Sequence, residues 1–192
     1  MLKMDKLSFS YGEKEVLHEL NLELGRGEIL AVMGPSGCGK STLLQLIAGL
    51  QSPKSGSILC NAKRISYAFQ EPRLFPWLTV KENLEAVLPS REDASDRIEK
   101  ALQTVELADS AGLYPDALSG GMKSRASLAR ALVYEGDLYL LDEPFSALDE
   151  ELRKRLCKSL REEIKARGAS AILVTHQLTD AQELADRTVQ LS

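Results

Sequence analysis

A glycine-rich loop between an apolar strand and an apolar-faced helix is the feature that most constrains the fold of this chain. Residues 29–33 are wholly apolar, which is typical of a strand inside a sheet covered on both faces. A helix is expected over residues 41–50, so the segment between them has the strand–loop–helix context that the pattern GxxxxGK[ST] requires. The residues that match this pattern are Gly34, Pro35, Ser36, Gly37, Cys38, Gly39, Lys40, Ser41 and Thr42. The sequence therefore predicts a site for the phosphates of a nucleotide.

The residue types in this loop fit phosphate chemistry. Glycines let the backbone curl so that several N–H groups point inward, and the following helix adds the partial positive charge of its N-terminus. Lys40 is placed to reach the β- and γ-phosphates, and the Ser41 hydroxyl is a ligand for Mg²⁺. The alternative is that a glycine-rich loop matches the pattern by chance, but the strand before it and the helix after it disfavour that interpretation.

A second apolar strand, residues 138–141, ends in two carboxylates, Asp142 and Glu143. The carboxyl end of a buried parallel strand is where such a site forms in an open α/β sheet, so we expect both beside the loop. Asp142 is predicted to hold Mg²⁺, and Glu143 to orient or deprotonate an attacking water. Either acid alone could simply cap the next helix. Together with the loop they predict an Mg-dependent nucleotide hydrolase or kinase.

The order of elements predicts an α/β fold with a parallel sheet, because strands and helices alternate in the last third. Strands are expected over residues 7–11, 20–24, 28–33, 57–60, 65–69, 137–141, 170–175 and 188–191. Helices are expected over 41–50, 80–88, 94–107, 122–133, 152–168 and 181–185.

Composition narrows the class of protein. A chain of 192 residues has the size of one domain, and it contains no apolar run of the length that spans a membrane. The net charge of -4 argues against broad nucleic-acid binding. The cysteines, Cys38, Cys60 and Cys157, are far apart and form no CxxC pair, so neither a disulfide framework nor a zinc site is expected. The N-terminus lacks the apolar core of a signal peptide.

One segment points to a particular family. Residues 118–122 read LSGGM and lie shortly before Asp142, and they resemble the LSGGQ signature of ATP-binding cassette (ABC) ATPases. Arg125 and the run 129–132 extend the match. Taken alone, Ser-Gly-Gly before a helix is an ordinary cap and turn.

Four single residues complete the resemblance. Tyr11 matches the aromatic residue that stacks on adenine, and Gln70 matches the glutamine that meets Mg²⁺ and senses the γ-phosphate. Asp149 ends a loop, 146–149, that resembles the one crossing to the partner subunit. His176 lies 33 residues after Glu143 and matches the switch histidine. Outside this family, a half-buried strand tyrosine or a histidine at a strand end would be unremarkable.

The resemblance implies a fold and a site. The fold is that of a P-loop NTPase: a RecA-like parallel-sheet core, an N-terminal antiparallel β-subdomain and an inserted helical subdomain at about 72–135, in one domain over 1–192. ATP and Mg²⁺ are the implied cofactors, in a head-to-tail homodimer where each signature faces the phosphates bound by the other subunit. The implied roles are catalysis by Lys40, Glu143 and His176, metal ligation by Ser41, Gln70 and Asp142, and nucleotide contact by Tyr11, Ser119, Gly120, Gly121, Asp149 and the loop 34–42.

The stretch 70–84 and Met122 resemble the ATPase subunits of importers for nitrate, taurine, aliphatic sulfonates and thiamine precursors. In that family a helix of the membrane subunit docks beside this stretch, where Phe75, Trp77 and Leu78 would line a groove with Arg73 at its edge. Burial of Trp77 in the helical subdomain is the alternative.

The favoured function is thus the ATPase subunit of an importer, cytoplasmic and peripheral on the inner face of the membrane. Its expected partners are permease subunits and, indirectly, a solute-binding protein. A soluble cassette ATPase acting on DNA is disfavoured by the short segment between Gln70 and Ser119, and one acting on ribosomes is disfavoured because this chain has one cassette where such relatives have two. A kinase or GTPase leaves the signature unexplained, and an exporter subunit stays open. Two departures stand out: Ser124 replaces a usual glutamine, and relatives usually continue with helices beyond the last strand.

Overall fold

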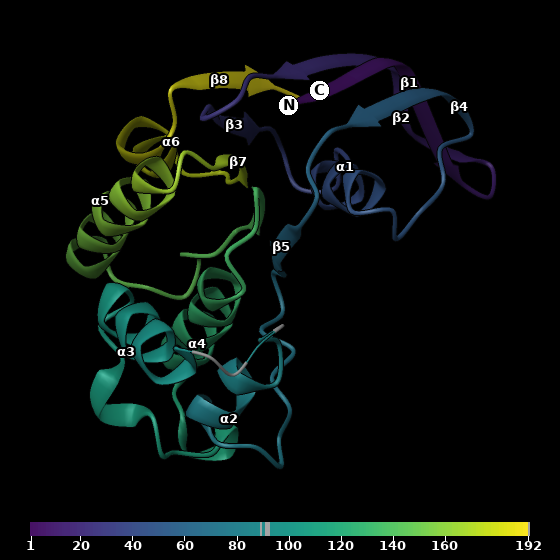
Figure 1. Ribbon diagram of the computed structural model, residues 1–192. Helices are drawn as coiled ribbons and strands as arrows, with labels where there is room; N and C mark the ends of the chain where they lie inside the picture. The colour runs from purple at the N-terminus through teal and green to yellow at the C-terminus, as the bar shows by residue number, and fades with distance from the viewer. Residues whose placement is uncertain (89, 91–92, 192) are drawn as a thin grey trace.

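The computed structural model describes residues 1–88, 90 and 93–191 and contains two sheets (Figure 1). An antiparallel sheet has the order β2-β1-β4, and a parallel sheet has the order β5-β6-β7-β3-β8. The antiparallel strands are β1 (Leu2–Tyr11), β2 (Lys14–Leu24) and β4 (Ser55–Cys60). The parallel strands are β3 (Ile29–Met33), β5 (Ile65–Ala68), β6 (Leu138–Asp142), β7 (Ser170–Val174) and β8 (Arg187–Gln190). The predicted α/β fold, with an antiparallel N-terminal sheet and a parallel core, is confirmed.

Helix α1 (Lys40–Ile47) lies between the two sheets. Its Leu43 and Leu44 are fully buried in one apolar cluster with Met4 and Leu7 of β1 and Leu140 of β6. Removing this apolar surface from water holds the helix against both sheets. The loop that precedes α1 is thereby fixed at the carboxyl end of β3.

The other helices cover the opposite face of the parallel sheet or form a group at one end of the molecule (Figure 1). Alternate residues of the strands, such as Tyr139 and Leu173, pack there with Leu128 and Leu160. The helices are α2 (Val80–Glu85), α3 (Ala94–Thr104), α4 (Gly120–Val133), α5 (Glu150–Ala166) and α6 (Leu178–Leu184), with short 3₁₀ turns at Ala108–Ser110 and Pro115–Ala117.

Most element boundaries lie within a few residues of their predicted places, but β1 and β2 begin well before the predicted strands 7–11 and 20–24. Helix α4 begins at Gly120 rather than at residue 122, because the Ser119 hydroxyl accepts a hydrogen bond from the Met122 N–H at 3.3 Å and starts the helix earlier. Helix α1 ends at Ile47 rather than at residue 50, since Gly49 adopts a left-handed backbone (φ 71°). The three cysteines are free, as predicted.

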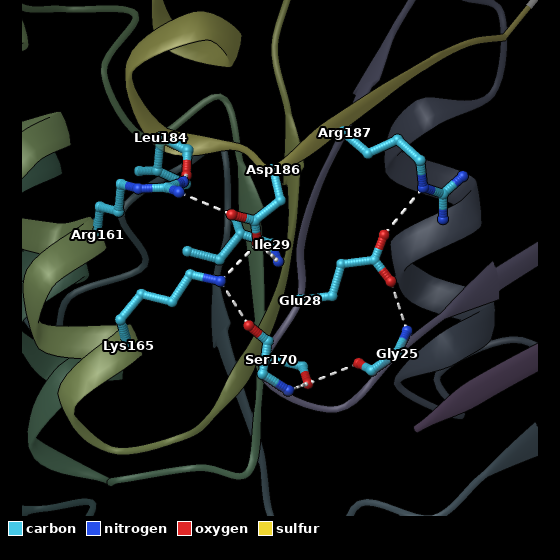
Figure 2. Close-up of polar contacts among 10 residues, drawn as sticks. Gly25, Glu28, Ile29, Arg161, Lys165, Ser170, Leu184, Asp186 and Arg187 are labelled. Carbon is cyan, nitrogen blue, oxygen red and sulfur yellow. Dashed lines mark hydrogen bonds and ion pairs between the residues drawn. The ribbon is translucent and has the colours of Figure 1, made fainter.

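A polar network joins α5 to the amino ends of β3, β7 and β8 (Figure 2). The carboxylate of Asp186 accepts the Ile29 N–H at 2.8 Å, Lys165 Nζ at 2.5 Å and Arg161 Nη2 at 2.7 Å. Burial raises the pKa of Asp186, but the hydrogen bonds from Lys165, Ile29 and Arg161 outweigh it and lower that pKa to about 2. The ionised form is therefore the one that the folded state stabilises.

This network predicts how acid affects stability. Since the folded pKa lies below the ordinary 3.8, Asp186 stabilises the fold above about pH 4 and loses this effect as the pH falls through about 2. We expect Asp186→Asn to lower the free energy of unfolding by about 1 kcal/mol at pH 7, a value reduced by solvent screening. Urea unfolding at pH 7 and at pH 2 should show the difference shrinking in acid, whereas Asp5→Asn, an exposed control, should change little. A loss of equal size at both pH values would contradict this role.

Candidate nucleotide site

The loop before α1 adopts a backbone that only glycine accommodates well. Gly37 and Gly39 have φ values of 81° and 98°, in the left-handed region that disfavours other residues. A Cβ on Gly39 would also lie 2.8 Å from Val16 Cγ1 and 3.1 Å from the Val16 carbonyl oxygen. The tight curl therefore depends on these two positions.

Lys40 lies inside the curl. Its side chain is buried, and Nζ donates hydrogen bonds of 2.8 Å to the carbonyl oxygens of Gly34 and Pro35. The N-cap residue of α1, Gly39, provides no side-chain cap, so the first N–H groups of the helix can bind an anion. The loop thus combines an ammonium group with a helix N-terminus, which is the arrangement that phosphate binding needs.

Next to the loop, the Ser41 hydroxyl donates a 3.0 Å hydrogen bond to Asp142 Oδ1. Asp142 is the last residue of β6 and is 3% exposed. Burial raises the pKa of Asp142, against the hydrogen bond from Ser41, which lowers it. A cation at this point would favour the ionised carboxylate. A hydroxyl and a carboxylate are the oxygen ligands that Mg²⁺ prefers, so the pair fits that ion.

Glu143 and His176 face each other at the neighbouring strand end. Glu143 has φ 46° and donates its N–H to the Val174 carbonyl at 2.9 Å, so it prolongs the pairing of β6 with β7. His176 follows β7 by two residues, and its Nδ1 lies 3.3 Å from Glu143 Oε1. The carboxyl ends of two adjacent parallel strands thus bring a carboxylate and an imidazole together.

A cavity of about 330 Å³ opens at this place, lined by the loop, Lys40, Ser41, Tyr11, Gln70 and Glu143. Tyr11, at the end of β1, is half exposed and stands edge-on to Phe9 with ring centroids 4.8 Å apart. The structure therefore brings together predicted site residues from four separate parts of the chain. Lys14 also lines the cavity, and the sequence analysis missed it, although its place just across the turn from Tyr11 was a usable signal.

Asp142 and His176 contact the lining residues Ser41 and Glu143 without lining the cavity themselves, and four further predicted site residues lie elsewhere. Ser119, Gly120, Gly121 and Asp149 do not line this cavity in the described part of the chain. Ser119 caps α4, and Asp149 caps α5 by accepting the Leu152 N–H at 3.0 Å. The two caps are neighbours, because a Cβ on Gly121 would lie 3.0 Å from the Ala147 carbonyl oxygen. The signature and the loop 146–149 therefore form one surface of their own.

The loop after Gln70 is held rigidly with its aromatic rings outward. The amide of Asn83, fully buried, bonds to the backbone of Phe75, Leu78 and Thr79. Trp77 is 70% exposed, with its ring 5.6 Å from that of Phe75. The interpretation of Trp77 as a core residue of the helical subdomain is therefore wrong. The hydrogen bonds of Asn83 order the loop, so the loop does not need a buried tryptophan ring to hold it.

Arg130 of α4 also holds this loop. Its guanidinium donates to the carbonyl oxygens of Pro72 at 2.9 Å and Arg73 at 2.8 Å. From the sequence, Arg130 is expected only as part of the extended signature, since nothing local indicates a partner 57 residues away.

A phosphate loop, a serine–aspartate pair and a glutamate beside a histidine, on the carboxyl edge of a parallel sheet, define a P-loop nucleotide hydrolase. The family model described as ABC transporter matches residues 17–146. An aliphatic sulfonates import ATP-binding protein of Burkholderia cenocepacia is 43% identical over 189 residues, which cover 95% of this chain and 70% of that protein. A sulfate/thiosulfate import ATP-binding protein of Caulobacter vibrioides is 40% identical, over 95% of this chain and 59% of that protein. The chain belongs to the ABC transporter family.

Solved structures agree with this assignment. A dimeric bacterial ABC transporter cassette superposes with a TM-score of 0.92 at 30% identity, over 100% of this chain and 94% of that one. The same cassette in a post-hydrolysis state, bound to ADP and Pi, gives a TM-score of 0.90 at 29% identity, with the same coverage. These relatives support the import ATPase interpretation over a kinase, a GTPase or a soluble cassette ATPase. In the part of the chain that the structure describes, no helix has the length and apolar character of a membrane span.

The contact at Gly121 predicts different effects for two adjacent glycines. Around Gly120 a Cβ would meet nothing within 4 Å, whereas on Gly121 it would meet Ala147 O at 3.0 Å and Leu148 Cδ2 at 3.1 Å. Gly120→Ala should leave the free energy of unfolding unchanged or raise it, because alanine favours a helix. The free energy of unfolding of Gly121→Ala should be about 1 kcal/mol lower than that of Gly120→Ala, because the loop that contains Ala147 and Leu148 must move to make room for the methyl group. Urea unfolding of the two variants compares them, and equal values would refute the tight contact.

Proposed function

We propose that this chain binds and hydrolyses ATP and thereby drives solute import through membrane permease subunits. The observation that carries the proposal is the single cavity in which Lys40, Ser41, Gln70 and Glu143 meet, beside the Ser41–Asp142 hydrogen bond. The names of the curated relatives, which are import ATP-binding proteins, support the coupling to import.

The proposed reaction is in-line attack of water on the γ-phosphate. The ammonium of Lys40, the inward backbone N–H groups of the loop and the N-terminus of α1 stabilise the negative charge that develops on the phosphate oxygens. Glu143 accepts the proton of the attacking water, since its carboxylate borders the cavity. His176, held by Glu143 Oε1 at 3.3 Å, keeps the γ-phosphate and the water in line.

Three side chains are proposed as the Mg²⁺ ligands. The Ser41 hydroxyl would contribute directly, Asp142 through water, and Gln70 as a further lining residue of the same cavity. The bound ion would neutralise the β- and γ-phosphate oxygens during the reaction.

The nucleotide site is proposed to be completed by a second copy of the chain. The signature residues and Asp149 lie outside the cavity, on their own surface, and the similar cassettes are described as dimeric. In a head-to-tail dimer the Ser119 hydroxyl and the N–H groups of Gly120 and Gly121 would meet the γ-phosphate held by the other copy. The N-terminus of α4 would then add its partial positive charge.

The aromatic surface formed by Phe75 and Trp77 is the proposed docking site for the permease, with Leu78 beside it and Arg73 at its edge. Exposed aromatic rings on a rigid loop are typical of binding hot spots, and Asn83 supplies that rigidity here. We assign these residues to a helical subdomain over about 72–135, within one domain of 1–192. Docking would place the chain peripherally on the inner face of the membrane, with a solute-binding protein as an indirect partner.

The proposed solute is nitrate, a sulfonate, taurine or a similar small molecule. The similar proteins are named as import ATP-binding proteins for aliphatic sulfonates and for sulfate or thiosulfate. The choice among such solutes would be made by the permease and the solute-binding protein, because the residues that line the cavity are assigned to the nucleotide.

Two substitutions separate binding from chemistry. Glu143→Gln removes the base but keeps the cavity, so we expect unchanged Mg-ATP affinity, hydrolysis slowed by a factor on the order of 10² or more, and accumulation of a closed dimer. Lys40→Ala removes the ammonium group and should weaken Mg-ATP binding itself. Equilibrium nucleotide binding, phosphate release and size-exclusion chromatography measure these effects. Full turnover by Glu143→Gln would exclude it as the base, and unchanged affinity in Lys40→Ala would count against the phosphate loop.

The docking surface is tested by Trp77→Ala. A hot-spot ring removed from an interface costs about 2 kcal/mol, so capture of the permease from detergent-solubilised native membranes should fall sharply while Mg-ATP affinity stays the same. Leu59→Ala is the control, because Leu59 is also an exposed apolar residue, 61% accessible, but lies on β4. Mass spectrometry of the captured proteins identifies the partner. An unchanged yield for Trp77→Ala, or an equal loss for Leu59→Ala, would contradict the assignment.

A further inference from the structure

An ion pair behind the candidate site joins two of its loops. Arg153, in the first turns of α5, donates a 2.8 Å hydrogen bond from Nη2 to the carbonyl oxygen of Leu148. Its Nε lies 3.8 Å from Oδ1 of Asp180 in α6. The side chains of Arg153 and Asp180 are only 15% and 4% exposed. One guanidinium thus touches the loop 146–149 on one side and α6 on the other.

The second oxygen of Asp180 continues the connection. Oδ2 accepts a 2.9 Å hydrogen bond from the Thr175 hydroxyl, which itself accepts the Gln177 N–H at 3.0 Å. His176 lies between these two anchored residues. Its own ring contacts Glu143 and Gln177 and is half exposed, so its position is set mainly by the backbone on either side.

The other end of the connection is the surface that carries the signature. Leu148, whose carbonyl oxygen Arg153 holds, neighbours Ala147, which packs against Gly121. A displacement of the loop 146–149 therefore acts on the guanidinium, then on Asp180, and then on the two residues that flank His176.

Stability alone does not account for this pair. A buried ion pair adds little net stability, because the loss of hydration offsets the attraction between the charges. Here Arg153 Nε and Asp180 Oδ1 lack a hydrogen-bond partner in the described part of the chain and are joined only by the 3.8 Å contact. What the pair does specify is geometry, since it fixes two loops that are separated by more than twenty residues.

We propose that Arg153 and Asp180 are positioning residues that couple the loop 146–149 to His176. Contact of that loop with a second copy of the chain then holds the imidazole in the place opposite Glu143 that it already occupies in one copy. This inference rests on the proposed function, because it takes the loop to face the partner copy and His176 to act in hydrolysis. Both residues act through others, and neither touches the nucleotide.

Three substitutions test the connection link by link. Thr175→Val removes the hydroxyl with little change of volume, Asp180→Asn removes the charge but keeps an oxygen for Thr175, and Arg153→Gln removes the guanidinium. A small misplacement of a catalytic group is enough to slow a reaction strongly. We expect kcat for ATP hydrolysis by the full chain to fall on the order of 10-fold in each, with the Mg-ATP dissociation constant changed less than about 2-fold. The double variant at 153 and 180 should lose no more than the worse single variant, since both interrupt one connection.

Two further variants separate positioning from general damage. Arg155→Gln removes a cation from the same helix, where Arg155 pairs with Glu106 at 2.8 Å on the surface, and kcat should stay unchanged. Thr175→Ser keeps the hydroxyl and should recover most of the kcat lost in Thr175→Val. Unchanged kcat in both Thr175→Val and Asp180→Asn would overturn the proposal, as would additive losses or an equal loss in Arg155→Gln. Absence of ATPase activity in the wild-type chain assembled with its captured permease would instead refute the proposed function.

Discussion

The packing of α1 between the antiparallel and the parallel sheet is the constraint on which the rest of the structure depends. Leu43 and Leu44 join the two sheets in one apolar cluster, and this fixes the place where the chain must leave β3 and enter the helix. The left-handed glycines follow from that geometry, because the loop has to turn sharply against Val16 of the antiparallel sheet. A strand–loop–helix unit without the second sheet would lack this wall, and Tyr11 would not reach the cavity.

The parallel order of the strands brings the remaining site residues together at one edge of the sheet. Asp142 and Glu143 are adjacent in sequence and yet serve different neighbours, because the strand ends between them and the backbone of Glu143 becomes left-handed. One carboxylate faces the Ser41 hydroxyl across the sheet edge, and the other faces His176 from β7. A buried acid held beside a hydroxyl and a more accessible acid held beside an imidazole are suited to different roles, one for a cation and one for a water molecule.

The sequence predicted what is encoded locally and missed what depends on distant contacts. The phosphate loop, the strand ends at Asp142 and Glu143 and the start of α4 within two residues follow from short-range patterns. The outward position of Trp77 does not, because it depends on Asn83, whose amide replaces the support of a buried ring. Apolar character at residue 77 predicts burial equally well, and only the tertiary structure decides. The tight approach of Gly121 to Ala147 was likewise invisible, since both residues lie in ordinary caps and turns.

The signature surface lies apart from the nucleotide cavity, and this separation bears on how hydrolysis is controlled. In one copy, the signature and Asp149 are packed together on a surface apart from the cavity that holds Lys40, so the groups proposed to stabilise the γ-phosphate cannot all act from a single chain. Hydrolysis would then require the approach of a second copy, and that copy would make its first contact at the loop 146–149. A chain with a complete site of its own would hydrolyse ATP whether or not it was assembled. The proposed division of the site between copies would instead make assembly, and hence the state of the permease, a condition for turnover.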